Sequence, residues 1–201
     1  MPLLSLETYV FPEDLLARPP AETGDKEDWW VLHTRPRAEK CLARRFLDRQ
    51  VSYFLPLYER QWRKRGRLFR SYLPLFPGYL FVHGGSQVRL AALETNLVAR
   101  VLPVPDQARL QADLQRVYRL VTSGQVLRPE QRLLPGSWVE IIGGPMQGLE
   151  GKVIRSAKGL KFFVEVEFLQ RGVSVEIDSS MIQPSNVRPS AATTGRTLTR
   201  H

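Results

Sequence analysis

The sequence contains little cysteine and histidine, and it has no long apolar run. Its 201 residues include one cysteine, Cys41, and three histidines, His33, His83 and His201. A lone thiol excludes an internal disulfide, and these few scattered ligands exclude a zinc centre of the usual type. No stretch approaches the roughly 20 consecutive apolar residues that span a bilayer, so we expect no membrane association.

Motifs for export and for catalysis are missing as well. Residues 1–10 do not combine a basic start with an apolar run, so we predict no secretory signal and expect a cytoplasmic protein. Glycine-rich phosphate loops are absent, and the carboxylates form no acid–base pair. Cys41 lies beside Lys40 and Arg44 without a partner base, and we interpret it as a half-buried helix residue. The sequence therefore predicts a protein that is not an enzyme and has no cofactor or metal site.

Positive charge is concentrated in one segment. Residues 28–127 hold 17 basic and 7 acidic side chains, a net charge of +10. By contrast, residues 1–27 carry −4, residues 128–187 are neutral, and the remaining tail carries +3. This asymmetry favours a polyanionic partner for residues 28–127, although a basic surface can also serve solubility.

Proline and glycine positions and the hydrophobic period divide the chain into five parts. Residues 1–27 contain four prolines and no sustained period, which predicts a flexible arm. Residues 28–123 mix helical and strand patterns, and residues 124–134 read as a linker. Residues 135–187 show strand patterns only, and residues 188–201 have the composition of a disordered tail.

The first domain is expected to be α+β. Its predicted elements are strand 29–34, helix 37–50, strand 52–58, a basic hairpin with its tip at Gly66, strand 79–82, helix 87–95, strand 100–104, and a helix that Asp106 caps and that ends near residue 122. The order β-α-β-β-β-α-β-α lacks strict alternation. It therefore predicts an antiparallel sheet flanked by helices.

The second domain follows a period of two. Short runs of alternating apolar and polar residues are separated by glycine turns from residue 136 onward. Four or five short strands in about 50 residues suit a small closed barrel, because closure leaves few free strand edges.

Three segments carry a resemblance to the NusG family of transcription factors. Residues 29–34 (Trp-Trp-Val-Leu-His-Thr) are similar to the opening strand of the NusG N-terminal domain. Residues 74–82, with an intact Phe-Pro-Gly-Tyr core, resemble the most characteristic segment of that domain, and residues 135–153 resemble a KOW motif. The resemblance spans roughly residues 28–187 and implies a NusG-type N-terminal domain followed by an SH3-like KOW β-barrel. KOW motifs also occur in ribosomal proteins, so the first domain decides the family.

The resemblance implies an elongation factor that binds bacterial RNA polymerase and suppresses pausing or termination. In this family an aromatic patch of the N-terminal domain binds the clamp helices of the large polymerase subunit. The matching positions are Phe76, Tyr79 and Phe81. Exposed aromatic side chains make good anchors for a protein partner, although one face of the strand must instead pack into the core.

The resemblance also implies contact with the non-template DNA strand. The matching cations follow the first strand and lie on the basic side of the predicted helix 37–50: Arg35, Arg37, Lys40, Arg45 and Arg49. Such contacts would go mainly to phosphates and weaken with salt. An ordinary amphipathic helix with a solvated face explains the pattern about as well. The hairpin arginines between Arg63 and Arg70 suit upstream DNA or a solvated tip equally.

Two further sites follow from the resemblance. Thr95 and Asn96 match a second polymerase contact, but the family's Gly-Val-Arg stretch after them is replaced here by residues 97–101 (Leu-Val-Ala-Arg-Val). Met146 and Leu149 match the KOW loop that meets Rho or a small-subunit ribosomal protein, with local barrel packing as the alternative. The departure, the long arm and the strong positive charge favour a specialised, operon-targeted antiterminator of the RfaH kind.

A different class of function competes with this interpretation. An RNA- or ribosome-binding module would use the basic domain and the KOW barrel without polymerase. The neutral net charge of residues 128–187 argues against RNA binding by the barrel and favours a protein partner. We expect a monomer.

Overall fold

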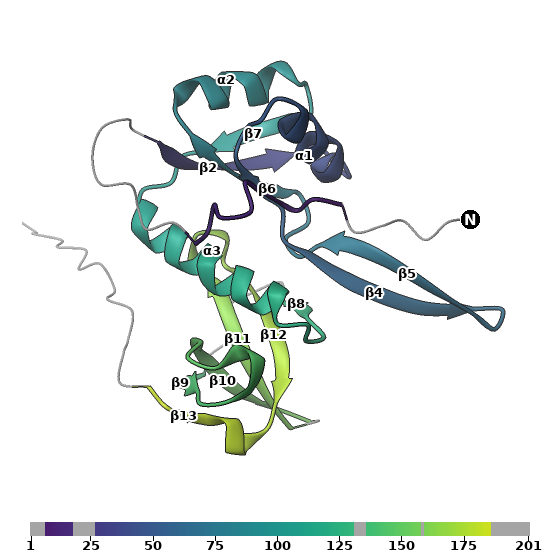
Figure 1. Cartoon of the computed structure of the whole chain (residues 1–201), viewed down its shortest axis with the longest axis vertical. Coiled ribbons are helices and arrows are strands. Elements are labelled where there is room, and N and C mark those ends of the chain that lie inside the picture. The colour runs from purple at the N-terminus through teal and green to yellow at the C-terminus, as the bar shows by residue number, and fades with distance from the viewer. Residues whose placement is uncertain (1–6, 18–26, 131–135, 158, 186–201) are drawn as a thin grey trace, which may run out of the picture.

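The structure is a computed structural model that describes residues 7–17, 27–130, 136–157 and 159–185. These residues form a mixed fold of helices and antiparallel sheets, which confirms the predicted α+β class (Figure 1). The helices are α1 (Glu39–Asp48), α2 (Ser86–Glu94) and α3 (Gln107–Thr122). The strands are β1 (Val10–Phe11), β2 (Asp28–Thr34), β3 (Tyr53–Phe54), β4 (Leu57–Lys64), β5 (Arg67–Pro74), β6 (Tyr79–Gly84), β7 (Val98–Leu102), β8 (Arg128–Glu130), β9 (Ser137–Ile141), β10 (Glu150–Ser156), β11 (Gly159–Val166), β12 (Arg171–Ile177) and β13 (Ile182–Pro184). In the described ranges, no helix is long and apolar enough to cross a membrane.

The N-terminal sheet has the strand order β1-β3-β6-β2-β7 and is covered on both faces. Side chains alternate across a strand, so neighbouring residues of β2 enter different layers. Leu32 packs into the cluster that contains Leu42 and Phe46 of α1. Val31 instead joins the cluster that contains Leu114 of α3. The sheet therefore lies between the α1/α2 layer and α3.

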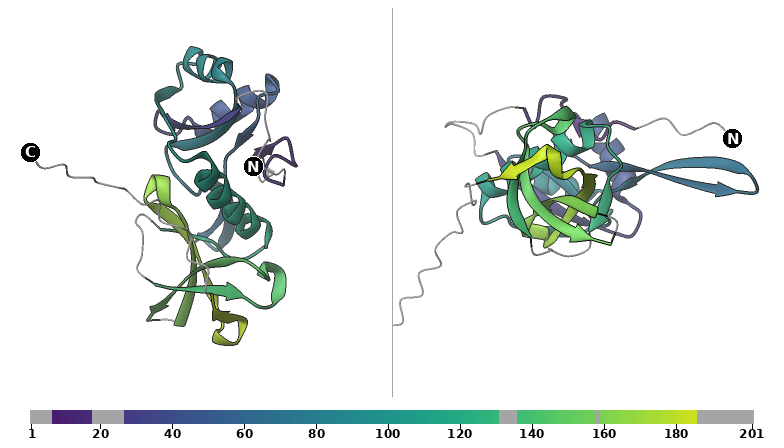
Figure 2. Two further views of the ribbon diagram at one scale, coloured as in Figure 1. Left: turned by 90° about the vertical axis from the view of Figure 1, so that its left-hand side faces the viewer. Right: turned by 90° about the horizontal axis from the view of Figure 1, so that it is seen from below.

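Helix α3 lies between the two larger sheets (Figures 1 and 2). Asp106 caps it by accepting a hydrogen bond from the Arg109 amide at 2.8 Å, as the sequence predicts. One continuous hydrophobic cluster joins Val117 of α3 to Phe81 of the N-terminal sheet and to Phe162 of β11. The two halves of the chain therefore share a core across this helix.

The C-terminal sheet has the order β13-β9-β10-β11-β12-β8, and its inward side chains follow the predicted period of two. Strand β8 lies within the predicted linker 124–134, yet it pairs with β12 through Pro129 and Val173. That part of the linker prediction is corrected: residues 128–130 belong to the sheet, because pairing satisfies the edge of β12.

Residues 7–17 differ from the predicted flexible arm. Strand β1 pairs with β3, and Leu15 and Leu16 are buried in the core. The Tyr53 hydroxyl donates to the Thr8 carbonyl at 2.8 Å. A strand this short shows no hydrophobic period. The sequence pattern therefore could not distinguish a segment that pairs with a sheet edge from a flexible, proline-rich arm. The predicted tail, residues 188–201, lies outside the described residues.

The helix and strand limits also shift for identifiable reasons. Helix 37–50 was predicted too long, because Arg37 and Gln50 have positive φ values of 62° and 54°, which α-helical backbone excludes. The predicted strand 52–58 is divided around Pro56 into β3 and β4. The basic hairpin turns at Gly66 as predicted and forms a separate two-stranded ribbon, β4–β5, that projects from the body (Figure 1).

The docking of residues 7–17 predicts a local pH dependence. Glu7 accepts hydrogen bonds from Arg44 at 3.0 and 3.1 Å, and these bonds lower the pKa of Glu7 from its usual value of 4.5. A lowered folded-state pKa stabilises this contact at neutral pH, and the stabilisation is lost as pH falls below 4.5 through the folded pKa. Acidification should therefore lower the protection factor of the Leu55 amide, which donates to Tyr9, after the slower intrinsic exchange at acidic pH is corrected for. Hydrogen exchange measured by NMR checks this, and the Glu7→Gln variant should lack this loss of protection. An identical pH profile in the variant would contradict the assignment.

Candidate functional site

The aromatic segment before β6 is held by a tight turn. The Tyr79 amide donates to the Phe76 carbonyl at 3.0 Å, and Gly78 has a φ of +85°, which favours glycine. The Gly78 amide donates to the Glu39 carboxylate at 2.7 Å. Glu39 is buried in the first turn of α1 and thereby anchors the turn. Sequence reasoning missed this role of Glu39, and its place on the apolar side of the helix was the only signal.

The three predicted polymerase-binding aromatics lie in different environments. Phe76 and Phe81 are 1% and 0% exposed, and their rings meet edge to face with centroids 6.0 Å apart. Tyr79 is half-buried at the rim of this cluster, beside the His33 ring at 5.2 Å. Of these three aromatic residues, only Tyr79 has part of its ring exposed at the edge of the core.

The C-terminal sheet reaches over this rim. The Arg171 guanidinium lies 5.0 Å from the centroid of the Tyr79 ring, within the range of a cation–π contact. The same guanidinium donates to the Pro77 carbonyl at 3.3 Å. Arg171 begins β12, so the C-terminal sheet contacts the turn before β6 through this residue.

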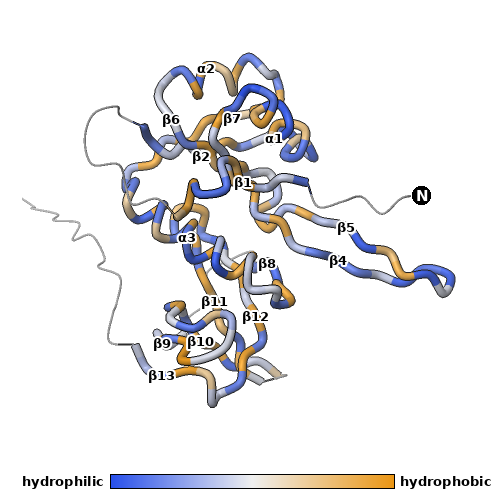
Figure 3. The backbone as a smooth tube through the Cα atoms, viewed as in Figure 1, coloured by the Kyte–Doolittle hydropathy of each residue, from blue (hydrophilic) through white to orange (hydrophobic). Residues whose placement is uncertain are grey.

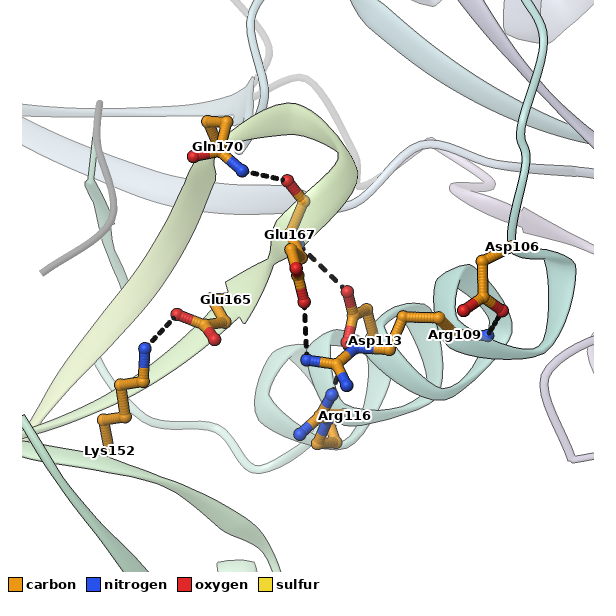
Figure 4. A network of polar contacts seen from close by, with 8 residues as sticks. All are labelled: Asp106, Arg109, Asp113, Arg116, Lys152, Glu165, Glu167 and Gln170. Atoms are coloured by element: carbon orange, nitrogen blue, oxygen red, sulfur yellow. Dashed lines mark hydrogen bonds and ion pairs between the residues drawn. The ribbon is translucent and has the colours of Figure 1, made fainter. Parts of the chain in front are cut away.

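A buried polar network joins α3 to the C-terminal sheet (Figure 4). Asp113 is fully buried and pairs with Arg116 from the next turn. Its other oxygen accepts from the Glu167 amide at 3.0 Å. Arg109 lies 3.6 Å from Asp113 and pairs with the Glu167 carboxylate at 2.7 Å. Burial raises the pKa of Asp113, and the two arginines and the Glu167 amide oppose that rise.

Other arginines of α3 extend the same interface. Arg119 donates to the carbonyls of Gln147 and Gly148 at 2.6 and 3.1 Å. The Arg116 guanidinium lies 5.9 Å from the Trp138 ring centroid. The sequence contained one signal for this interface, because Asp113 falls on the otherwise apolar side of the helix. A carboxylate placed there needs cationic partners.

The predicted DNA-binding cations are not equally available. Lys40 pairs with Glu7 at 3.8 Å, and Arg49 lies 4.0 Å from Glu94. Arg45 donates to the Thr95 carbonyl at 3.0 Å. Arg35 and Arg37 are exposed, and within the described ranges their side chains have no polar partner. These two arginines are the members of the predicted set whose side chains lack a polar partner in the described residues, and Arg49 is itself half-exposed.

The remaining predicted sites are mostly engaged in local structure. The Thr95 hydroxyl is buried and donates to the Ala92 carbonyl, whereas Asn96 is exposed at a φ of 58°. Met146 and Leu149 are 6% and 0% exposed, which corresponds to local packing and leaves little of either side chain for a partner in this arrangement. Cys41 is exposed, so its interpretation as a half-buried helix residue was wrong.

The comparisons with known proteins agree with this architecture. A family model described as "Transcription termination factor nusG" matches residues 27–130, more than half of the chain. This match suggests a role in transcription. The chain belongs to the NusG family, whose members generally bind RNA polymerase. A search of the curated proteins finds no significant match.

Proposed function

We propose that this protein is a transcription elongation factor that binds bacterial RNA polymerase and suppresses pausing or termination in the cytoplasm. The observation that carries the proposal is the turn before β6, which lies inside the family match and presents Tyr79 at its rim. We assign the contact with the clamp helices of the large subunit to Tyr79. Phe76 and Phe81 support it from beneath, because a rigid apolar base favours an aromatic anchor.

Polymerase binding at Tyr79 requires the C-terminal sheet to move. Arg171 covers the Tyr79 ring, and the Asp113 network holds the sheet against α3. A partner can displace this interface only if its own contacts offset the lost ones. Such a requirement for release supports a specialised antiterminator of the RfaH kind over a general factor. Thr95 and Asn96 remain the proposed second polymerase contact. Asn96 is the more accessible of the two because its side chain is exposed.

The proposal extends to DNA and to the C-terminal partner. Arg35 and Arg37 suit phosphates of the non-template strand because they are exposed cations beside the turn. We propose that residues 135–187 are a KOW-type, SH3-like barrel that meets Rho or a small-subunit ribosomal protein. The antiparallel strand order supports a barrel, and the neutral net charge of residues 128–187 supports a protein partner.

Tyr79→Ala should weaken binding of the full chain to a reconstituted bacterial elongation complex by about tenfold or more, the effect of removing a central aromatic anchor. Tyr72→Ala is the matched control, because Tyr72 is also half-buried but lies on the hairpin. Binding can be measured by fluorescence titration of labelled protein. Equal affinities for the two variants would refute the Tyr79 assignment, and free RNA competing as well as the complex would favour the RNA-module alternative.

A further inference from the structure

The projecting hairpin separates its side chains into two chemically different faces. Strand register places Trp62 opposite Phe69 and Lys64 opposite Arg67. Residues two apart in a strand share a face, so Arg60 lies on the same side. We call this side the stacking face: Arg60, Trp62, Lys64, Arg67 and Phe69. It contains three cations, two aromatics and no carboxylate.

The opposite face of the hairpin is different. It holds Glu59, which pairs with Arg70 at 3.4 Å and accepts a hydrogen bond from Gln61 at 2.7 Å. Leu68 and Arg63 face each other closer to the tip. The hairpin's only acidic side chain is therefore neutralised on the face that lacks the aromatic pair.

The aromatic pair on the stacking face is exposed rather than buried. The Trp62 and Phe69 rings stack with centroids 5.7 Å apart and an interplanar angle of 16°. They remain 42% and 40% exposed, on a ribbon that projects from the body (Figure 1). Figure 3 shows an apolar stretch close to the hydrophilic tip of this ribbon. An aromatic cross-strand pair can serve only to stabilise the hairpin. That role does not explain why cations, and no carboxylates, flank the two rings.

We propose that the stacking face binds single-stranded nucleic acid. Unpaired bases would stack on the outer faces of Trp62 and Phe69. Phosphates would pair with Arg60 on one side of the aromatic pair and with Lys64 and Arg67 on the other. Cations beside an exposed aromatic platform are the combination that single-stranded chains require. An intact duplex lacks free base faces for this platform, because its bases already stack on one another.

Charge decides between nucleic acid and a protein partner. Three unpaired cations around two rings favour a polyanion with flat apolar groups, and single-stranded DNA or RNA combines both. Within the described ranges, the side chains of Arg60, Lys64 and Arg67 have no hydrogen bond or ion pair. The proposal concerns a surface separate from Tyr79 and does not depend on polymerase binding.

Binding of labelled 12-nucleotide oligothymidylate, 12-nucleotide oligouridylate and a 12-base-pair DNA duplex to the full chain tests the proposal by fluorescence anisotropy. The Trp62→Ala/Phe69→Ala variant should lose about tenfold or more of its affinity for the single strands, the size expected for stacking at one or two bases. Leu68→Ala truncates an exposed apolar residue of the opposite face and should change affinity less than about twofold. Trp62→Phe keeps a ring and should retain most of the binding. The two oligonucleotides distinguish DNA from RNA, and binding of either one supports the site.

A second matched pair of variants tests the contribution of charge. Arg67→Ala and Arg63→Ala each remove one cation near the tip, but from opposite faces. Only Arg67→Ala should lower affinity and reduce the slope of log affinity against log salt by about 0.7, the value for one phosphate of a single strand. Equal effects of the two variants would indicate diffuse electrostatic attraction and overturn the site. Tighter binding of the duplex, or unchanged binding after loss of both rings, would overturn it as well. Because the hairpin projects from the core, urea unfolding midpoints should stay close to that of the unaltered chain.

Discussion

Asp113→Ala is expected to lower the free energy of unfolding by about 3 kcal/mol, the cost of breaking a buried ion pair from one side. Asp113 is 0% exposed, and its carboxylate holds Arg116 and the Glu167 amide. Its removal leaves cations and an amide donor without their acceptor at the contact between α3 and the C-terminal sheet. Urea unfolding followed by circular dichroism measures the loss.

The same variant tests whether this network holds the two sheets together. Exchange of the Glu167 amide should accelerate at least tenfold in Asp113→Ala, because that amide donates to Asp113 at 3.0 Å. Asp113→Asn is the matched control, since its amide oxygen can still accept from Glu167 while the charge is lost. A loss below about 1 kcal/mol together with unchanged exchange would mean that apolar packing alone holds the sheets.

Gly172→Ala should destabilise the C-terminal sheet by about 3 kcal/mol, at the upper end of the usual cost of overpacking. A Cβ atom at Gly172 would meet the Val164 carbonyl oxygen at 2.5 Å and would also overlap the Phe163 ring. Both neighbours are fixed by the pairing of β11 with β12 and by burial, so neither can retreat without disturbing the sheet.

Gly85→Ala provides the reference for Gly172→Ala. A Cβ atom at Gly85 would have nothing within 4 Å, so its effect should stay below about 1 kcal/mol. Thermal and urea unfolding compare the two variants under identical conditions. Similar stabilities would show that β12 can shift at Gly172 and that close packing there is not required.

The interface across α3 links these stability predictions to the proposed function. Arg171, which covers Tyr79, begins the strand that follows Glu167, the residue that Asp113 and Arg109 hold. If polymerase binds at Tyr79, variants that loosen the network should not weaken that binding, whereas Tyr79→Ala should. The stability and binding measurements therefore report on different parts of the proposal.

Local patterns in the sequence were sufficient to predict most elements of the fold. The period of two in residues 136–185 predicted strands, and the helical period after Asp106 predicted α3 with its cap. These patterns reflect burial on one side of an element, which depends mainly on neighbours in the sequence. The NusG resemblance in residues 29–34 and 74–82 likewise predicted the family that the match over residues 27–130 confirms.

Contacts between distant segments could not be predicted from such local patterns. Strand β1 and strand β8 are only 2 and 3 residues long, too short for a period, and they form because a partner edge lies beside them. The exposure of Tyr79 against the burial of Phe76 and Phe81 depends on α3 and on β12. Neither is adjacent to these aromatics in the sequence.

The sequence by itself determined the types of the main elements, the basic character of the first domain and the family. Only the tertiary structure decided which of the predicted site residues remain available. Lys40, Arg45 and Arg49 are engaged by partners from other segments, while Arg35 and Arg37 are free of polar partners within the described ranges. Alternation along a strand shows that two faces exist, but burial of each face depends on the surface that packs against it.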